Sequence, residues 1–101
     1  MAFGIDAITP PLRNVKPVSF TVQSARLDAV TAGLFHLSRT AAAERIRVGD
    51  VHLNYELCQR PDAAAEPGDI ISLRGSGKAQ LTEIGGQSRK GRIFLSGEIW
   101  L

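Results

Sequence analysis

Residues 26–54 read RLDAVTAGLFHLSRTAAAERIRVGDVHLN, and this stretch predicts two short helices joined by a tight corner and followed by a strand. In its first half, residues at i, i+3, i+4 and i+7 form one face of a helix, namely Leu27, Val30, Thr31 and Leu34. Ser24 is the expected N-cap of this helix. Gly33 disfavours a helix interior, so it indicates close packing or an early helix end.

A second helix is predicted over residues 39–48, with Ser38 as its N-cap and Gly49 as its stop. Its narrow apolar face consists mainly of small side chains that allow close helix packing: Ala42, Ala43 and Ile46. Arginines stand at both ends of this helix, Arg39 in the first turn and Arg45 and Arg47 in the last. The corner is therefore edged with cationic side chains.

The rest of the chain predicts short strands separated by turns. Alternating apolar residues and glycine-rich breaks place strands near 18–22, 51–54, 56–58, 70–73, 78–84 and 92–96. Gly75-Ser76-Gly77 is a predicted hairpin turn, and Gly85-Gly86 is expected to end a strand. Residues 1–17, with three prolines and no periodicity, are expected to be an extended leader or an extraneous remnant. Residues 18–101 then form one α+β domain, a two-helix corner on a small, mostly antiparallel sheet with a C-terminal strand extension.

Composition limits the classes of protein to consider. The 101 residues suffice for one domain with a modest core, and no apolar run is long enough to span a bilayer. The N-terminus lacks a secretory signal pattern. The single cysteine, Cys58, cannot form an internal disulfide, and no cluster of metal-ligand residues appears. We expect a cytoplasmic protein with no metal and no cofactor.

Charge is distributed unevenly along the chain, although the net charge is only +2. Basic residues dominate residues 26–47 and 74–92, whereas residues 48–73 carry five acidic residues against Arg60 alone. If folding joins the two basic segments, one face is positive. We expect that face to hold Arg26, Arg39, Arg45, Arg74 and Lys78, with Asp62, Glu66 and Asp69 away from it.

The sequence offers no candidate active site. His36 and His52 fall in different elements without an obvious carboxylate neighbour, and Gly75-Ser76-Gly77 lacks the lysine and following helix of a phosphate-binding loop. We therefore expect a protein that is not an enzyme.

The start of the second helix is better suited to RNA. Structured RNA offers phosphates and 2′-hydroxyls to a protein, and a helix N-terminus attracts phosphate. Ser38, Arg39 and Thr40 add two hydroxyl groups and a guanidinium that can bind phosphate through two parallel hydrogen bonds. The alternative is that Ser38 only caps the helix and that Arg39 is solvated.

Four motifs of the chain together resemble the S-four RNA-binding domain, which is named after a small-subunit ribosomal protein. They are RLD, the SR pair, A-x-x-x-I-x-x-G-x-V-x-x-N and the later GDIISLRGSGK. The chain is most similar to the C-terminal S-four domain of the YlmH family of ribosome-associated RNA-binding proteins, over about residues 18–92. The resemblance implies a monomeric, non-catalytic part of a longer protein that docks on ribosomal RNA or on a tRNA-ribosome complex. It implies a role in translation quality control or ribosome-linked cell division.

The resemblance also implies which residues face the RNA. The predicted set is Arg26, Ser38, Arg39, Thr40, Arg45, Asn54, Tyr55, Arg74 and Lys78. Many S-four domains have glycine where this chain has Tyr55, and an aromatic residue there could stack on a base or pack over the sheet. For the arginines and Lys78 the alternative is a salt bridge or simple solvation. Asn54 could be a structural turn residue rather than a contact.

Two other functions remain open from the sequence. S-four domains are often appended to RNA-modifying enzymes such as pseudouridine synthases, so the domain could serve such an enzyme. Alternatively, the acidic segment could make it a protein-interaction module.

Overall fold

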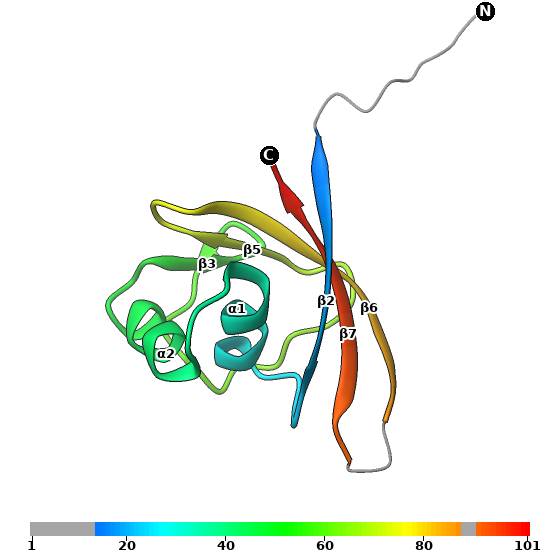
Figure 1. Ribbon diagram of the computed structural model, residues 1–101. Helices are drawn as coiled ribbons and strands as arrows, with labels where there is room; N and C mark the ends of the chain where they lie inside the picture. Colours follow the sequence, from blue (N-terminus) through cyan, green and yellow to red (C-terminus); the bar gives the residue numbers. More distant parts are fainter. Residues whose placement is uncertain (1–13, 88–90) are drawn as a thin grey trace, which may run out of the picture.

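The structure is a computed structural model that describes residues 14–87 and 91–101 (Figure 1). Two helices, α1 (Leu27–Phe35) and α2 (Arg39–Arg47), pack on one side of a six-stranded sheet. The strands are β2 (Val15–Val22), β3 (Val51–Leu53), β4 (Glu56–Leu57), β5 (Ile70–Leu73), β6 (Gly77–Gln87) and β7 (Ile93–Trp100). Their order is β2-β7-β6-β5-β3-β4, and neighbouring strands pair antiparallel within the described residues. The predicted α+β fold, a helix corner on a small sheet, is confirmed.

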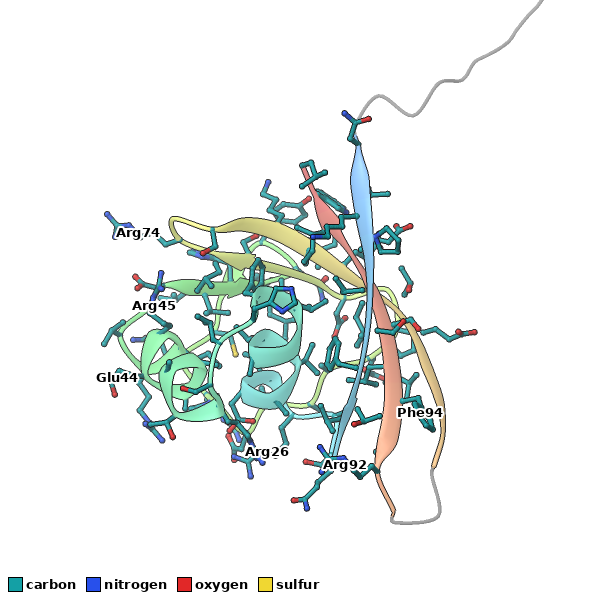
Figure 2. All side chains as sticks on the ribbon, in the orientation of Figure 1. Arg26, Glu44, Arg45, Arg74, Arg92 and Phe94 are labelled. Carbon is teal, nitrogen blue, oxygen red and sulfur yellow. The ribbon has the colours of Figure 1, made fainter. Side chains whose placement is uncertain are left out.

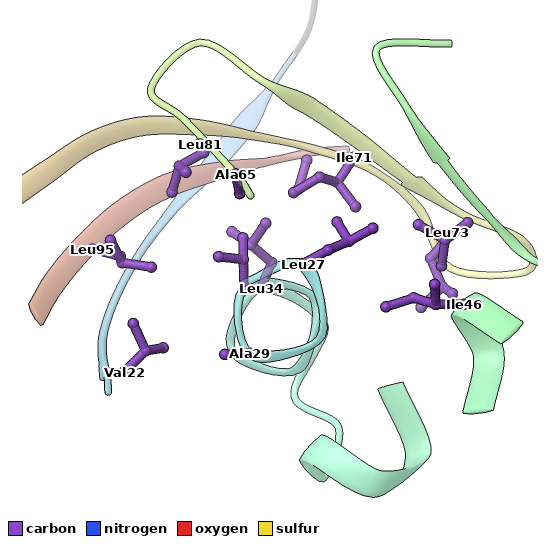
Figure 3. Packing of buried hydrophobic residues seen from close by; sticks show 13 residues of the cluster. Val22, Leu27, Ala29, Leu34, Ile46, Ala65, Ile71, Leu73, Leu81 and Leu95 are labelled. Carbon is purple, nitrogen blue, oxygen red and sulfur yellow. The ribbon is translucent and has the colours of Figure 1, made fainter. Parts of the chain in front are cut away.

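The apolar stripe predicted for the first helix is the centre of the core. Leu27, Val30 and Leu34 are each at most 1% exposed, and Thr31 beside them is fully buried. They pack against inward-facing residues of the sheet, which alternate along each strand (Figure 3). Those sheet residues include Ile71, Leu73, Leu81 and Leu95, while Ile46 closes the core from α2. The three apolar positions expected on α2 are all buried.

Two glycines let α1 lie close to the strands. A Cβ atom on Gly33 would stand 2.3 Å from ring atoms of Phe20, and one on Gly97 would stand 2.7 Å from Leu34 Cδ2. Both distances are far inside van der Waals contact, so any larger residue would push α1 away from β2 or β7. Of the two explanations for Gly33, close packing is the one that applies.

The start of α1 differs from the prediction. Its N-cap is Arg26, in an extended conformation and without a side-chain cap hydrogen bond, rather than Ser24. Backbone hydrogen bonds from the loop at residues 61–65 hold this helix start instead: Leu27 N donates to Ala63 O at 2.8 Å and Asp28 N to Pro61 O at 3.0 Å. A distant loop therefore replaces the local cap that the sequence pattern indicated.

Strands β2, β6 and β7 are longer than predicted. Strand β2 begins at Val15, so the predicted leader overlaps it, while residues 1–13 of that leader lie outside the described residues. Pro17 is tolerated because β2 is the sheet's edge strand. Strand β6 continues through Gly85 and Gly86 to Gln87, where irregular pairing with β7 accommodates extra residues. Residues 88–90, within the basic segment 74–92, lie outside the described residues.

The predicted hairpin turns are confirmed, and one is unusual. Gly75 and Gly77 have φ values of +84° and +105° in the β5–β6 turn. Asn54 and Tyr55, between β3 and β4, also have positive φ values of +52° and +69°. A two-residue hairpin turn with both φ values positive favours Asn-Gly, so a tyrosine at its second position is strained. Neither helix is long enough to cross a membrane within the part of the chain that the structure describes.

Candidate nucleic-acid interface

A buried carboxylate organises the helix corner. Asp28, in the first turn of α1, is only 5% exposed. Its Oδ2 atom lies 3.2 Å from Nη2 of Arg26, and its Oδ1 atom lies 3.5 Å from Nε of Arg39 at the start of α2. Backbone N–H of Ala29 also donates to Oδ1 at 2.7 Å. We call Asp28, Arg26 and Arg39 the Asp28 cluster.

The two arginines of this cluster are anchored on one side and open on the other. Their side chains are 43% and 47% exposed, whereas the carboxylate between them is nearly inaccessible. A guanidinium has five N–H donors, and one carboxylate oxygen occupies only part of that capacity. The Asp28 cluster therefore presents two oriented guanidinium groups to an incoming acceptor such as a phosphate.

The start of α2 is capped as the sequence predicts. Ser38 Oγ accepts a hydrogen bond from Ala41 N at 3.0 Å, so its hydroxyl oxygen is engaged in the cap. Thr40 is exposed in the same turn. The helix N-terminus adds its partial positive charge close to Arg39. Arg39, Thr40 and the capped turn together form a compact site with the chemistry of an anion receptor.

A second group of charges lies at the other end of α2. Nε of Arg45 lies 2.7 Å from Oδ2 of Asp50, and Nη2 of the same guanidinium donates to the backbone carbonyl of Arg74. Arg74 N donates to Asp50 O at 2.9 Å. Figure 2 shows Arg45 and Arg74 together at this side of the domain. We call Asp50, Arg45 and Arg74 the Asp50 cluster; in it Arg45 holds the β5–β6 hairpin, and the exposed Arg74 side chain projects from that hairpin.

The turn after β3 presents an aromatic ring beside a lysine. Tyr55 is 60% exposed, and Nζ of Lys78 lies 4.9 Å from the centre of its ring. Asn54 has a structural role: Nδ2 donates to Asp69 Oδ1 at 3.0 Å, and Oδ1 accepts from Ile70 N at 2.9 Å. These hydrogen bonds fix the turn that carries Tyr55.

The five basic residues expected on one face fall into separate groups instead. Along α2, Arg39 of the Asp28 cluster and Arg45 of the Asp50 cluster are six residues apart, which is about 9 Å at 1.5 Å per residue. In the strand register, Lys78 lies opposite Ser72 and Trp100. The helices cover one face of the sheet, and the side chain of Lys78 lies on the other face. Asp69 Oδ1 accepts a hydrogen bond from Asn54 Nδ2, so this acidic residue lies beside the turn that carries Tyr55.

Two hollows flank Arg39. One has a volume of about 290 Å³ and runs along α2, where it is lined by Asp28, Arg39, Thr40, Ala43 and Arg47. The other, of about 370 Å³, lies between β2 and α1 and includes Arg39 and Arg92 in its wall. Arg39 therefore lines both hollows.

Sequence reasoning missed the residues that position the arginines. The sequence pattern assigns no site role to Asp28, and Asp50 belongs there only to the acidic segment of residues 48–73. Arg92 was counted among basic residues but was not assigned to the site, although its Nε atom donates to Thr21 Oγ1 at 3.2 Å. Asp28 and Asp50 share one signal that could have indicated them: each is an acidic residue close to a helix start or end, with arginines nearby in the sequence.

We compared the chain with protein-family models and with known proteins. No protein-family model matches the chain, so the S-four assignment remains a prediction. Within the described residues, no group of three or more metal-ligand side chains occurs. Over 80 residues, 79% of this chain, the sequence is 36% identical to "Ribosome-associated protein quality control protein P2" of Bacillus subtilis (strain 168).

The matched region is only part of that relative. The alignment spans 31% of the relative's length, so it says nothing about the activity of the remaining part. The similarity supports a relationship between this chain and ribosome-associated proteins.

Proposed function

We propose that this chain is a non-catalytic RNA-binding domain of the S-four type, related to YlmH proteins, that docks on structured RNA of the ribosome. The observation that carries the proposal is the Asp28 cluster, in which a buried carboxylate orients two half-exposed arginines beside a helix N-terminus. Such a site suits phosphates, which are regularly spaced along an RNA strand and need no sequence readout. The ribosome-associated relative supports ribosomal RNA, or a tRNA-ribosome complex, as the target.

The other predicted residues take distinct roles in this proposal. Arg26, Arg39 and Thr40 contact phosphate, while Ser38 shapes the turn that carries them. Arg45 positions the β5–β6 hairpin so that Arg74 reaches a second stretch of backbone. Tyr55 stacks on an accessible nucleotide at the edge of the RNA contact, and the neighbouring Lys78 forms an ion pair with its phosphate. The domain acts as a monomer within translation quality control.

Co-sedimentation with separated ribosomal subunits tests this function. The wild-type chain is expected to pellet with one subunit at low salt, and crosslinks from the helix corner are expected to map to ribosomal RNA. Lys16→Ala serves as the control because it removes one charge from the exposed part of β2 and is not part of either cluster. Arg39→Ala should lose binding, whereas Lys16→Ala should retain it. Absence of binding to either subunit and to tRNA-bearing ribosomes would reject the proposal.

A further inference from the structure

The hollow between β2 and α1 has a composition unlike that of a phosphate site. Its apolar lining includes Phe20, Val22, Ala32 and Leu37. Phe20 is half-buried, its ring lies against Gly33, and it also borders a space of about 370 Å³. We call this space the Phe20 hollow. An apolar lining of this size suits a flat heterocycle better than a hydrated ion.

The mouth of the Phe20 hollow is cationic. Arg39 reaches it from α2, and Arg92 reaches it from the start of β7. Arg92 is held against the edge strand by two hydrogen bonds to Thr21, from Nε to Oγ1 at 3.2 Å and from Nη2 to the backbone carbonyl at 3.4 Å. Figure 2 shows Arg92 and Arg26 toward the same end of the domain. Arg39 keeps its ion pair with Asp28, whose carboxylate is not part of the lining of the hollow.

An amide side chain is also part of the wall. Gln23 follows β2, is exposed and lines the hollow. Its amide offers donors and an acceptor, which is the pattern needed to bind the edge of a nucleobase. The three parts of the hollow thus match the three parts of one nucleotide. The apolar lining suits the base, the amide of Gln23 suits the edge of the base, and the two arginines suit the phosphate.

We propose that the Phe20 hollow binds a single unpaired nucleotide of the RNA, with its base against Phe20 and its phosphate facing Arg39 and Arg92. This inference rests on the proposed function, because it assumes that the Asp28 cluster brings RNA to the corner. A paired base cannot enter, since its faces are stacked within the duplex, whereas a bulged base can swing out and stack on an aromatic side chain. The domain then prefers helical RNA interrupted by a bulge.

Two labelled RNA hairpins with the same number of nucleotides test this preference. One is fully paired in its stem, and the other carries one bulged nucleotide. Titration by fluorescence anisotropy at fixed salt should give a Kd for the bulged RNA that is about 5–100-fold lower, because one base gains stacking on an aromatic side chain. Ala32→Leu places a larger side chain in the hollow and should abolish this difference while leaving the Kd for the paired RNA within about twofold of the wild type.

Matched variants separate a filled hollow from a damaged fold. Ala32→Ser keeps the residue small and should retain the preference, and melting curves should show that both Ala32 variants are folded. Gln23→Ala, at an exposed position, should change which of the four bulged bases binds most tightly. If the wild type binds both RNAs equally, or if Ala32→Leu weakens both equally while Ala32→Ser weakens neither, the Phe20 hollow is not a nucleotide site. Failure to bind either RNA would instead reject the proposed function itself.

Discussion

Asp28 Oδ1 lies 3.5 Å from Nε of Arg39, so the buried carboxylate of one helix sets the direction of an arginine on the next. Simple charge counting treats Asp28 as an unfavourable neighbour of RNA, because its negative charge repels phosphate. The geometry assigns it the opposite effect: it holds Arg26 and Arg39 in place before RNA arrives, which lowers the entropy lost on binding.

Asp28→Asn distinguishes these two views. The substitution keeps the side-chain shape and raises the net charge by one, so a purely electrostatic contact would bind RNA more tightly. We expect weaker binding by about three- to tenfold, because both guanidinium groups lose their anchor. We also expect a loss of about 1–2 kcal/mol in unfolding free energy, less than for a fully buried pair since both arginines are half-exposed. RNA titration and urea denaturation measure the two effects, and tighter binding would contradict the positioning role.

Tyr55→Gly tests whether the exposed ring is retained for binding. Glycine adopts the observed φ of +69° without strain, so the variant should be more stable than the wild type by about 0.5–1 kcal/mol despite losing the contact with Lys78. RNA affinity should fall several-fold because the stacking surface is removed. Tyr55→Phe, which keeps the ring, should bind like the wild type. Unchanged affinity in Tyr55→Gly would remove Tyr55 from the interface.

Gly33→Ala tests the close contact between α1 and β2. Helix propensity alone predicts a gain of about 1 kcal/mol, whereas the 2.3 Å approach of the new Cβ to Phe20 predicts a net loss of about 1–2 kcal/mol. Gly86→Ala is the matched control: nothing lies within 4 Å of its added Cβ, and the expected change is under about 0.5 kcal/mol. A stabilised Gly33→Ala variant would show that Phe20 moves freely and would weaken the case for the Phe20 hollow.

Features encoded by local pattern could be predicted from the sequence. The 3.6-residue period of Leu27, Val30 and Leu34 specifies both the helix and its buried face, because a helix repeats that spacing. Ser38 caps α2 through a contact three residues away, and Gly75 and Gly77 mark a turn that needs positive φ. Each of these depends on residues close together in the chain.

Features that depend on distant contacts could not be predicted in the same way. Arg92 donates to Thr21, which lies 71 residues earlier in the sequence, and no local sequence pattern predicts that contact. The start of α1 is held by Pro61 and Ala63 rather than by Ser24, because the loop carbonyls accept from the helix N–H groups that a cap would otherwise satisfy. The separation of the Asp28 and Asp50 clusters likewise follows from the length of α2 and the position of the β5–β6 hairpin, not from charge counts.

Salt dependence reports how many phosphates the domain contacts. With about three to five basic side chains engaged, the slope of log K against log salt should be about −2 to −4. Arg74→Ala should make the slope shallower by about one if its projecting side chain meets the backbone, and Lys16→Ala should leave the slope unchanged. A flat dependence for the wild type would indicate a partner that is not nucleic acid.

The most direct measurement compares Arg39→Ala, Ser38→Ala and Lys16→Ala by RNA titration and thermal melting at one salt concentration. Arg39→Ala should weaken binding by about 1.5–3 kcal/mol while shifting stability by less than about 1 kcal/mol, because it makes a charge-assisted contact from a half-exposed position. Ser38→Ala should lower stability by about 0.5–2 kcal/mol through loss of the cap, with a smaller effect on binding. Lys16→Ala should match the wild type in both. If Arg39→Ala instead binds RNA like the parent while melting much lower, Arg39 is a structural partner of Asp28, and the helix corner is not the RNA-binding site.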